Sequence, residues 1–343
     1  MRLASLGLLA LTSLAFAGDD GAKAAFFRSM RRTFPVNVVT VIIQRDPKNE
    51  GVMQTIRMER DKRGRFHHTV IQPLRLAGIE SADDGERARV YWPDQNLLID
   101  QASPLLDPDD APWRMKVAEA NYSFKFGEKA KIAGRDAIEV IAQPHYGAME
   151  TRHFFLDAKI YYPLRITSVQ PDGKETLYLD TKDILFPKQL SDDKFALKPV
   201  GAVKTLRYER PERMNVAEVT KRLGFEPMLP QQIPMGFKIQ EMQLTDSNDW
   251  HAAKIFINDG LVRATVYQWN AKYKVRLNSI ENSSFTEYRG LRMLLVCEIA
   301  PSLRDQLLAA FVERAEAEAQ IGQLGPFGTL SQDLGVERYI QER

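Results

Sequence analysis

Five histidines are the side chains in this sequence most able to bind a metal or transfer a proton. His67 and His68 are adjacent, so in an extended segment they point to opposite faces and cannot hold one ion together. His145, His153 and His251 stand apart, and no pair has the H-E-x-x-H spacing of zinc hydrolases. We therefore expect structural or surface roles for all five histidines and no metal site.

The other candidates for chemistry are an acidic run at Asp107–Asp110 and the single cysteine, Cys297. A calcium loop needs ligands at alternating positions, and a proline interrupts this run, so we expect a solvated loop. Cys297 lies in the apolar stretch RMLLVCEIA, which predicts a buried thiol with no cation nearby to activate it. The motifs G-x-x-x-x-G-K-[ST], G-x-G-x-x-G and G-x-S-x-G are missing from the sequence. We predict a protein that is not an enzyme and uses no cofactor.

The N-terminus has the pattern of an export signal. Arg2 precedes the apolar stretch Leu3–Ala17, which ends in the small-x-small cleavage site Ala15-Phe16-Ala17. The stretch is too short to favour the alternative, an uncleaved anchor helix. No later segment approaches 18 uninterrupted apolar residues, so we expect a soluble mature chain. The formal net charge of +2 provides no basic stripe for nucleic acid.

Apolar periodicity predicts one helix followed by many short strands. The helix is expected at 22–34, where Phe26, Phe27 and Met30 share a side, and Pro35 ends it. From Val36 to Leu197 the period is mostly two, which predicts about ten strands in meander order without βαβ alternation. Such a long antiparallel sheet must curl, because strand twist accumulates. Either the first helix or an insertion at 102–120 could cover its apolar face.

A second unit is predicted after a charged, proline-containing stretch that has no periodic face. Its first helix has Asn215 as N-cap and Gly224 as stop, and an amphipathic helix at 302–320 closes it. The expected division is a signal peptide at 1–17, a larger domain at 18–197, a linker at 198–214, a smaller α+β domain at 215–320 and a tail at 321–343.

Tyr91 and Trp92 are adjacent in a short strand between the turns Asp84-Gly85 and Pro93-Asp94-Gln95. Side chains alternate, so we expect Tyr91 on the convex face beside Arg89 and Trp92 on the dry concave face. A partly covered concave face would form a groove for acyl chains or an apolar peptide segment, whereas a fully packed core would leave none. The candidate groove residues are Val90, Trp92, Leu97, Ile99, Leu164, Ile166, Leu177 and Leu179.

The order of several segments resembles the periplasmic sigma-E regulatory proteins of the MucB/RseB type. MRRTFPVNVVTVIIQR and LAGIESADDGERARVYWPDQNLLID are similar to the first strands and the meander of that family. HFFLDAKIYYPLRITSVQPDGKETLYLDTKDI resembles a hairpin shared with the lipoprotein carriers LolA and LolB. LPQQIPMGFKIQEM and YRGLRMLLVCEIAPSLRDQLLAAF resemble the two ends of the family's second domain. The resemblance implies an α+β protein, in which helices cover a strongly curved, LolA-like half-barrel and a smaller α+β domain follows.

The same resemblance implies a function. The family binds the periplasmic part of a membrane anti-sigma factor and shields it from proteolysis, with lipid, lipoprotein or lipopolysaccharide fragments as signals. It implies a periplasmic location, peripheral to the membrane at most. The first strand begins with FPVNVV in place of the family's aromatic-x-Gly, and the tail past residue 320 has no family counterpart, which leaves room for another client.

Two competing functions remain, a lipid or lipoprotein carrier of the LolA/LolB type and an envelope enzyme. The second domain favours the regulator over the carrier, because the simple carriers have a single domain. The enzyme is the weakest hypothesis, because no nucleophile–base or metal constellation is present.

Overall fold

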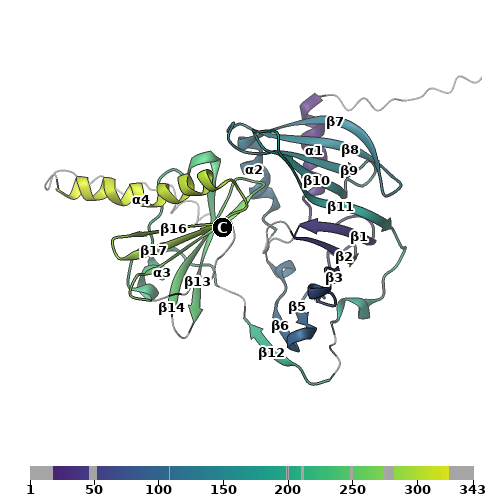
Figure 1. Cartoon of the computed structure of the whole chain (residues 1–343), viewed down its shortest axis with the longest axis horizontal. Coiled ribbons are helices and arrows are strands. Elements are labelled where there is room, and N and C mark those ends of the chain that lie inside the picture. The colour runs from purple at the N-terminus through teal and green to yellow at the C-terminus, as the bar shows by residue number, and fades with distance from the viewer. Residues whose placement is uncertain are drawn as a thin grey trace, which may run out of the picture.

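The structure is a computed structural model that describes residues 18–45, 52–107, 109–197, 199, 201–209, 212–247, 250–273, 275 and 282–323. Within these ranges the strands form two separate sheets (Figure 1). The signal peptide expected at 1–17 lies outside the described residues, as does the expected tail beyond Gln323. No described helix is both long and apolar enough to cross a membrane.

The large sheet has twelve strands in the order β12-β6-β5-β4-β3-β2-β1-β11-β10-β9-β8-β7. Two meanders, β1 to β6 and β7 to β11, meet where β1 pairs antiparallel with β11. The strands are β1 (Val38–Arg45), β2 (Met53–Arg60), β3 (Phe66–Gln72), β4 (Glu80–Asp83), β5 (Arg87–Trp92), β6 (Leu97–Ala102), β7 (Tyr122–Ile132), β8 (Arg135–Pro144), β9 (Thr151–Asp157), β10 (Pro163–Val169), β11 (Glu175–Leu185) and β12 (Lys204–Tyr208). The sheet curls without closing, so the predicted curved antiparallel α+β fold is confirmed.

Strand β1 lies in the middle of the large sheet because its sequence suits burial on both faces. VVTVIIQR is apolar at successive positions rather than at alternate ones, and β1 pairs with β2 on one side and β11 on the other. Val38, Thr40 and Ile42 are buried on the face that we call the inner face. The continuous apolar run thus coincides with a strand that has a neighbour on each side.

Two helices accompany the large sheet, α1 (Gly18–Ser29) and α2 (Ala111–Asn121). Helix α1 packs on the inner face of β7 and β8, where the Phe26 ring stacks on Phe124 at 4.7 Å and meets Phe154 at 4.9 Å. The helix expected at 22–34 therefore begins and ends earlier than predicted. It ends at Ser29, whose hydroxyl donates to the carbonyl oxygen of Phe26 at 2.6 Å.

Two segments of the large sheet differ from the sequence prediction. The expected linker, 198–214, contains β12, which pairs in parallel with β6. The sequence pattern does not reveal β12, because most side chains of this edge strand are exposed and no apolar face is needed. Within the run of strands predicted from Val36 to Leu197, Leu74–Leu76 form a short 3₁₀ helix before β4.

The small sheet has the order β13-β14-β15-β17-β16 and carries α3 (Val216–Leu223) and α4 (Pro301–Gln323) on one face. Its strands are β13 (Lys238–Ser247), β14 (Trp250–Asn258), β15 (Arg263–Asn270), β16 (Ser283–Tyr288) and β17 (Leu291–Val296). The predicted N-cap is present, since Asn215 and Glu218 form a reciprocal capping box. Leu307 and Phe311 of α4 are fully buried in a core with Cys297, which is buried as predicted. Burial raises the pKa of this thiol.

Candidate functional site

The hairpin of β5 and β6 places four of the predicted groove residues on the inner face. Val90 lies opposite Ile99 and Trp92 lies opposite Leu97 in the antiparallel register. All four side chains are only partly buried. Directly opposed side chains point to the same face of a sheet, so the register joins the four into one apolar surface.

The β10–β11 hairpin divides the other four predicted residues. Ile166 lies opposite Leu179 on the inner face, partly buried. Leu164 is fully buried in a core cluster, so it supports the sheet rather than lining a groove. A β-bulge after Ile166 places Leu177 opposite Thr167, on the outer face, where Leu177 is 36% exposed. The prediction that Leu177 and Leu179 share one face was wrong, because the extra residue in the bulge breaks the alternation.

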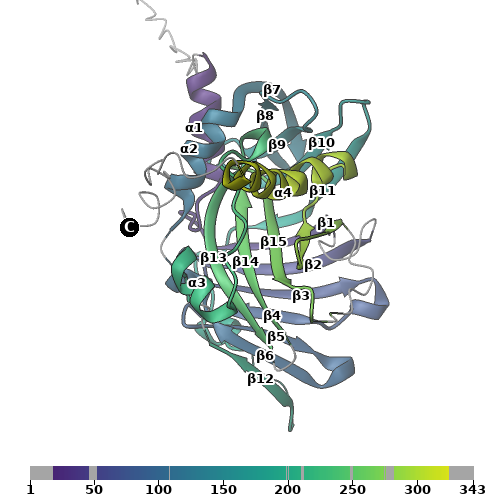
Figure 2. The same cartoon turned by 90° about the vertical axis from the view of Figure 1, so that its left-hand side faces the viewer.

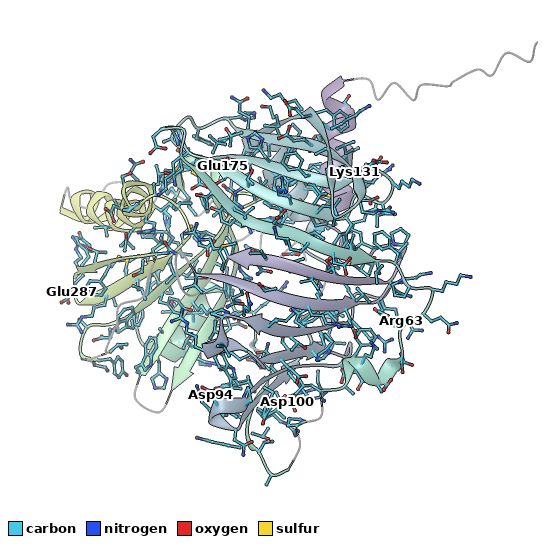
Figure 3. The ribbon with its side chains drawn as sticks, turned by 45° about the vertical axis from the view of Figure 1, so that its right-hand side comes forward. Arg63, Asp94, Asp100, Lys131, Glu175 and Glu287 are labelled. Carbon is cyan, nitrogen blue, oxygen red and sulfur yellow. The ribbon has the colours of Figure 1, made fainter. Side chains whose placement is uncertain are left out.

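The outer face of β5 and β6 is charged, and Tyr91 lies on it as predicted. Asp100 is labelled in Figure 3. Its buried carboxylate accepts from Arg87 Nε at 2.8 Å and lies 3.4 Å from a guanidinium nitrogen of Arg207. Arg89 pairs with Asp84 at 2.7 Å, and backbone and arginine hydrogen bonds hold the pKa of Asp84 below its usual value in spite of partial burial. The two faces of this hairpin therefore differ in chemistry, apolar inside and ionic outside.

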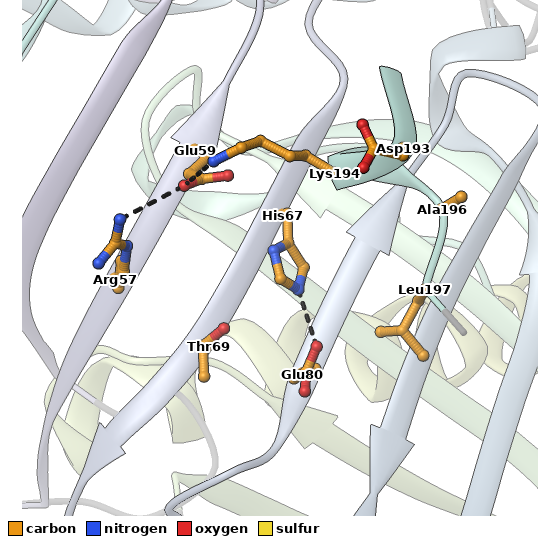
Figure 4. Close-up of a pocket in the computed structure, with 9 residues that line it drawn as sticks. All are labelled: Arg57, Glu59, His67, Thr69, Glu80, Asp193, Lys194, Ala196 and Leu197. Carbon is orange, nitrogen blue, oxygen red and sulfur yellow. Dashed lines mark hydrogen bonds and ion pairs between the residues drawn. The ribbon is translucent and has the colours of Figure 1, made fainter. Parts of the chain in front are cut away.

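The small sheet lies on the inner-face side of β1 to β6. Figure 2 shows it in front of these strands, and Figure 4 shows its ribbons behind them when they are viewed from the outer face. Helices α3 and α4 pack on one face of the small sheet with Ile255 and Val266. Alternate residues of β14 and β15 therefore point the other way, toward the large sheet. Gln240 confirms that contact, since its Nε2 donates to Asp110, at the start of α2, at 2.7 Å.

The face of the small sheet that points toward the large sheet carries a cluster that we call the Lys254 patch, made of Arg213, Glu241, Lys254, Phe256, Arg263 and Tyr267. The Arg263 guanidinium lies 3.8 Å and the Lys254 ammonium 4.7 Å from the centroid of the Phe256 ring. Both Arg213 and Arg263 pair with Glu241, at 2.8 and 3.4 Å. Burial lowers the pKa of Lys254, and the nearby Arg263 lowers it further. Apolar and cationic surfaces therefore face each other across the two sheets.

A buried polar clasp joins the two parts of the protein at the end of α2. The amide of Asn121 donates to the carbonyl oxygens of Gly236 and Asp259, at 2.9 and 2.8 Å, and the Tyr122 hydroxyl donates to Asp259 Oδ2 at 2.6 Å. Burial raises the pKa of both Tyr122 and Asp259. A Cβ on Gly260 would lie 2.3 Å from the backbone nitrogen of Ala118, so the chains approach too closely for any other residue.

Sequence reasoning missed the residues of this clasp. Asn121 begins the sequence Asn-Tyr-Ser, a weak match to a glycosylation motif, yet its side chain is buried and bonded to the small sheet. The remaining signals were a lone Asp259-Gly260 turn and two ordinary polar residues. No spacing rule connects them, because their partners lie more than a hundred residues apart.

A pocket of about 520 Å³ lies on the outer face, between β2 to β4 and the segment 193–197 (Figure 4). The polar groups of the pocket contact one another: Lys194 Nζ lies 2.7 Å from Glu59, and His67 Nε2 lies 2.9 Å from Glu80. Nothing was predicted here, and the pocket lies on the opposite side of the sheet from the groove residues.

His68 points to the inner face, opposite to His67, as the strand alternation predicted. Its ring stacks on Phe66 at 4.4 Å. Burial lowers the pKa of His68 to about 4, and the charge of Arg60 adds to the effect. Among the described residues no three histidine, cysteine or acidic side chains gather as metal ligands.

The sequence matches no protein-family model and no curated protein. Solved structures do resemble it. MucB aligns with a TM-score of 0.57 at 14% identity, over 85% of this chain and 98% of that chain. The chain has the MucB fold. A chain in the structure of the Pseudomonas aeruginosa MucA/MucB complex aligns with a TM-score of 0.59 at 14% identity. The alignment covers 83% of this chain and 96% of that chain.

The likeness to a LolA superfamily protein from Nitrosomonas europaea is much weaker. It has a TM-score of 0.25 at 11% identity and covers 51% of this chain and 97% of that chain. A score at that level supports no argument. The structural resemblance of this chain is therefore to MucB, and the alignment extends over both sheets.

Proposed function

We propose that this chain is a non-enzymatic binding protein of the bacterial periplasm that binds the periplasmic part of a membrane-bound anti-sigma factor. The observation that carries the proposal is the likeness to MucB over nearly the whole MucB chain, including MucB solved in complex with MucA. The apolar inner face of the large sheet and the Lys254 patch of the small sheet support the proposal, because the two surfaces are turned toward each other. An extended or helical segment of a partner could bury its apolar side chains there.

The proposal assigns the binding role to the inner face of the β5–β6 hairpin. Trp92 and Val90 lie there, partly buried, while Tyr91 lies on the outer face of the same strand. Aromatic side chains in such positions commonly dominate binding energy. Trp92 and Tyr91 therefore provide a matched pair of aromatic residues that are adjacent in one strand and lie on opposite faces.

The test is affinity capture from envelope extracts of the source bacterium with the mature chain and with Trp92→Asp and Tyr91→Asp. We expect the wild-type chain and Tyr91→Asp to recover one single-span membrane protein, and Trp92→Asp to recover at least tenfold less of it, about 1.4 kcal/mol or more. Urea unfolding of each variant separates lost binding from lost folding. Recovery of no membrane protein by the wild-type chain would refute the proposal.

A second candidate function is a carrier of lipid or lipoprotein acyl chains. The apolar and partly buried inner face around Trp92 favours it. Native mass spectrometry of the purified chain would then show a bound acyl species, and a fluorescent apolar probe would be displaced by fatty acid. If neither is observed while the membrane protein is captured, the carrier function is excluded.

A further inference from the structure

Lys254 differs from the other cations of the Lys254 patch because no ion pair joins it to an acid among the described residues, although the charge of Glu241 acts on it from farther away. Arg213 and Arg263 share Glu241, whereas Lys254 forms no ion pair or hydrogen bond with any residue in the described part of the chain. Three cations and one carboxylate leave the patch with a net positive charge. The unpaired charge is that of Lys254.

The surroundings of Lys254 make an unpaired charge costly. Its ammonium lies 4.7 Å from the ring centroid of Phe256 and 5.9 Å from that of Tyr267, and the side chain is partly buried. The rings offer a favourable electrostatic surface but no hydrogen-bond acceptor comparable to water. Burial takes water away from the Lys254 ammonium, and a carboxylate placed beside it would stabilise the charged form again.

The neighbouring acid of the large-sheet part cannot supply that carboxylate. Asp110 already accepts a hydrogen bond from Gln240 at 2.7 Å and forms ion pairs with Arg114 at 3.4 Å and Arg32 at 3.5 Å. Glu241 is occupied by its two arginines. Neither Asp110 nor Glu241 is therefore free to form an ion pair with Lys254.

We propose that Lys254 binds a carboxylate of an amphipathic partner segment whose apolar side chains pack on the inner face around Trp92. The inference rests on the proposed function, because it specifies which kind of segment the anti-sigma factor would insert between the sheets. A carboxylate fits better than a lipid phosphate. A phosphate group has several acceptor oxygens and binds best where several donors surround it. Arg213 and Arg263 already form ion pairs with Glu241, so Lys254 is the cation left to bind an anion.

The test compares two synthetic 12-residue leucine–serine peptides, one with two glutamates and one with two glutamines in their place. Binding to the mature chain is measured by isothermal titration calorimetry. We expect the glutamate peptide to bind about tenfold more tightly, because a hydrogen bond to a charged group contributes about that factor. Lys254→Gln should abolish the difference, Lys254→Arg should retain it, and Lys125→Gln, an exposed lysine on the outer face of β7, should leave it unchanged.

Several outcomes would overturn the inference. They are an equal affinity for both peptides, no binding of either peptide, and an undiminished preference in Lys254→Gln. The wild-type chain could also bind phosphatidylglycerol vesicles and neither peptide. If Lys254→Gln abolished that binding, the ligand of Lys254 would be a lipid and not a peptide carboxylate. If the captured membrane protein binds Lys254→Gln as tightly as wild type, only this inference fails. If it binds neither chain, the proposed function fails.

Discussion

His68 should make the stability of this protein fall as the pH falls from 7.5 to 5. Its pKa in the folded state is about 4, because burial disfavours the imidazolium, whereas an unfolded histidine titrates near 6.5. Between those values the unfolded chain binds more protons than the folded chain, so protons favour unfolding. The two pKa values predict a loss of about 2 kcal/mol between pH 7.5 and pH 5 from this residue alone.

The variant His68→Phe keeps the stacking on Phe66 and removes the titration. We expect urea unfolding, followed by circular dichroism at pH 7.5 and pH 5, to show about 2 kcal/mol less pH dependence in His68→Phe than in the wild type. His67→Gln on the outer face is the control and should keep most of the wild-type dependence, since His67 is the smallest of the three causes that lower the pKa of His68. Equal pH dependence in wild type and His68→Phe would refute the reasoning.

Three further predictions test the clasp and the bulge by thermal or urea unfolding. Gly260→Ala should cost roughly 2 kcal/mol more than Gly173→Ala, since both have positive φ but only Gly260 meets backbone; equal costs would contradict the close approach. Leu164→Ala should cost about 2 to 5 kcal/mol and Leu177→Ala under about 1 kcal/mol, and comparable losses would contradict the bulged register. Asn121→Ala should cost about 1 to 3 kcal/mol by leaving two buried carbonyl oxygens without a donor, so an unchanged unfolding midpoint would argue against the clasp.

Local patterns predicted the strands well because each strand follows from short-range rules. The Asp84-Gly85 turn fixes the β4–β5 hairpin, and alternation then fixes which faces Tyr91 and Trp92 occupy. The same rule failed in the β10–β11 hairpin. The apolar residues around Leu177 continue to alternate in the sequence, so no composition signal reveals that a bulge reverses the face.

The pairing of β1 with β11 and the clasp lay beyond any local rule. Val39 meets Leu185 across more than 140 residues of chain, and only the complete three-dimensional arrangement brings them together. Asn121 and Asp259 are 138 residues apart, and each is an ordinary polar residue in its own segment. Sequence patterns locate faces, whereas these contacts depend on which faces meet.

The clasp holds the small sheet in its orientation relative to the large sheet. Three hydrogen bonds and two glycine contacts fix the small sheet to the end of α2, and all the bonded side chains are buried. Such a junction resists reorientation, because each broken bond would leave a buried polar group unpaired. Trp92 and Lys254 belong to different sheets, so a partner that contacts both depends on this junction as much as on either residue. Weakening the clasp should therefore reduce partner affinity even when neither binding surface is altered.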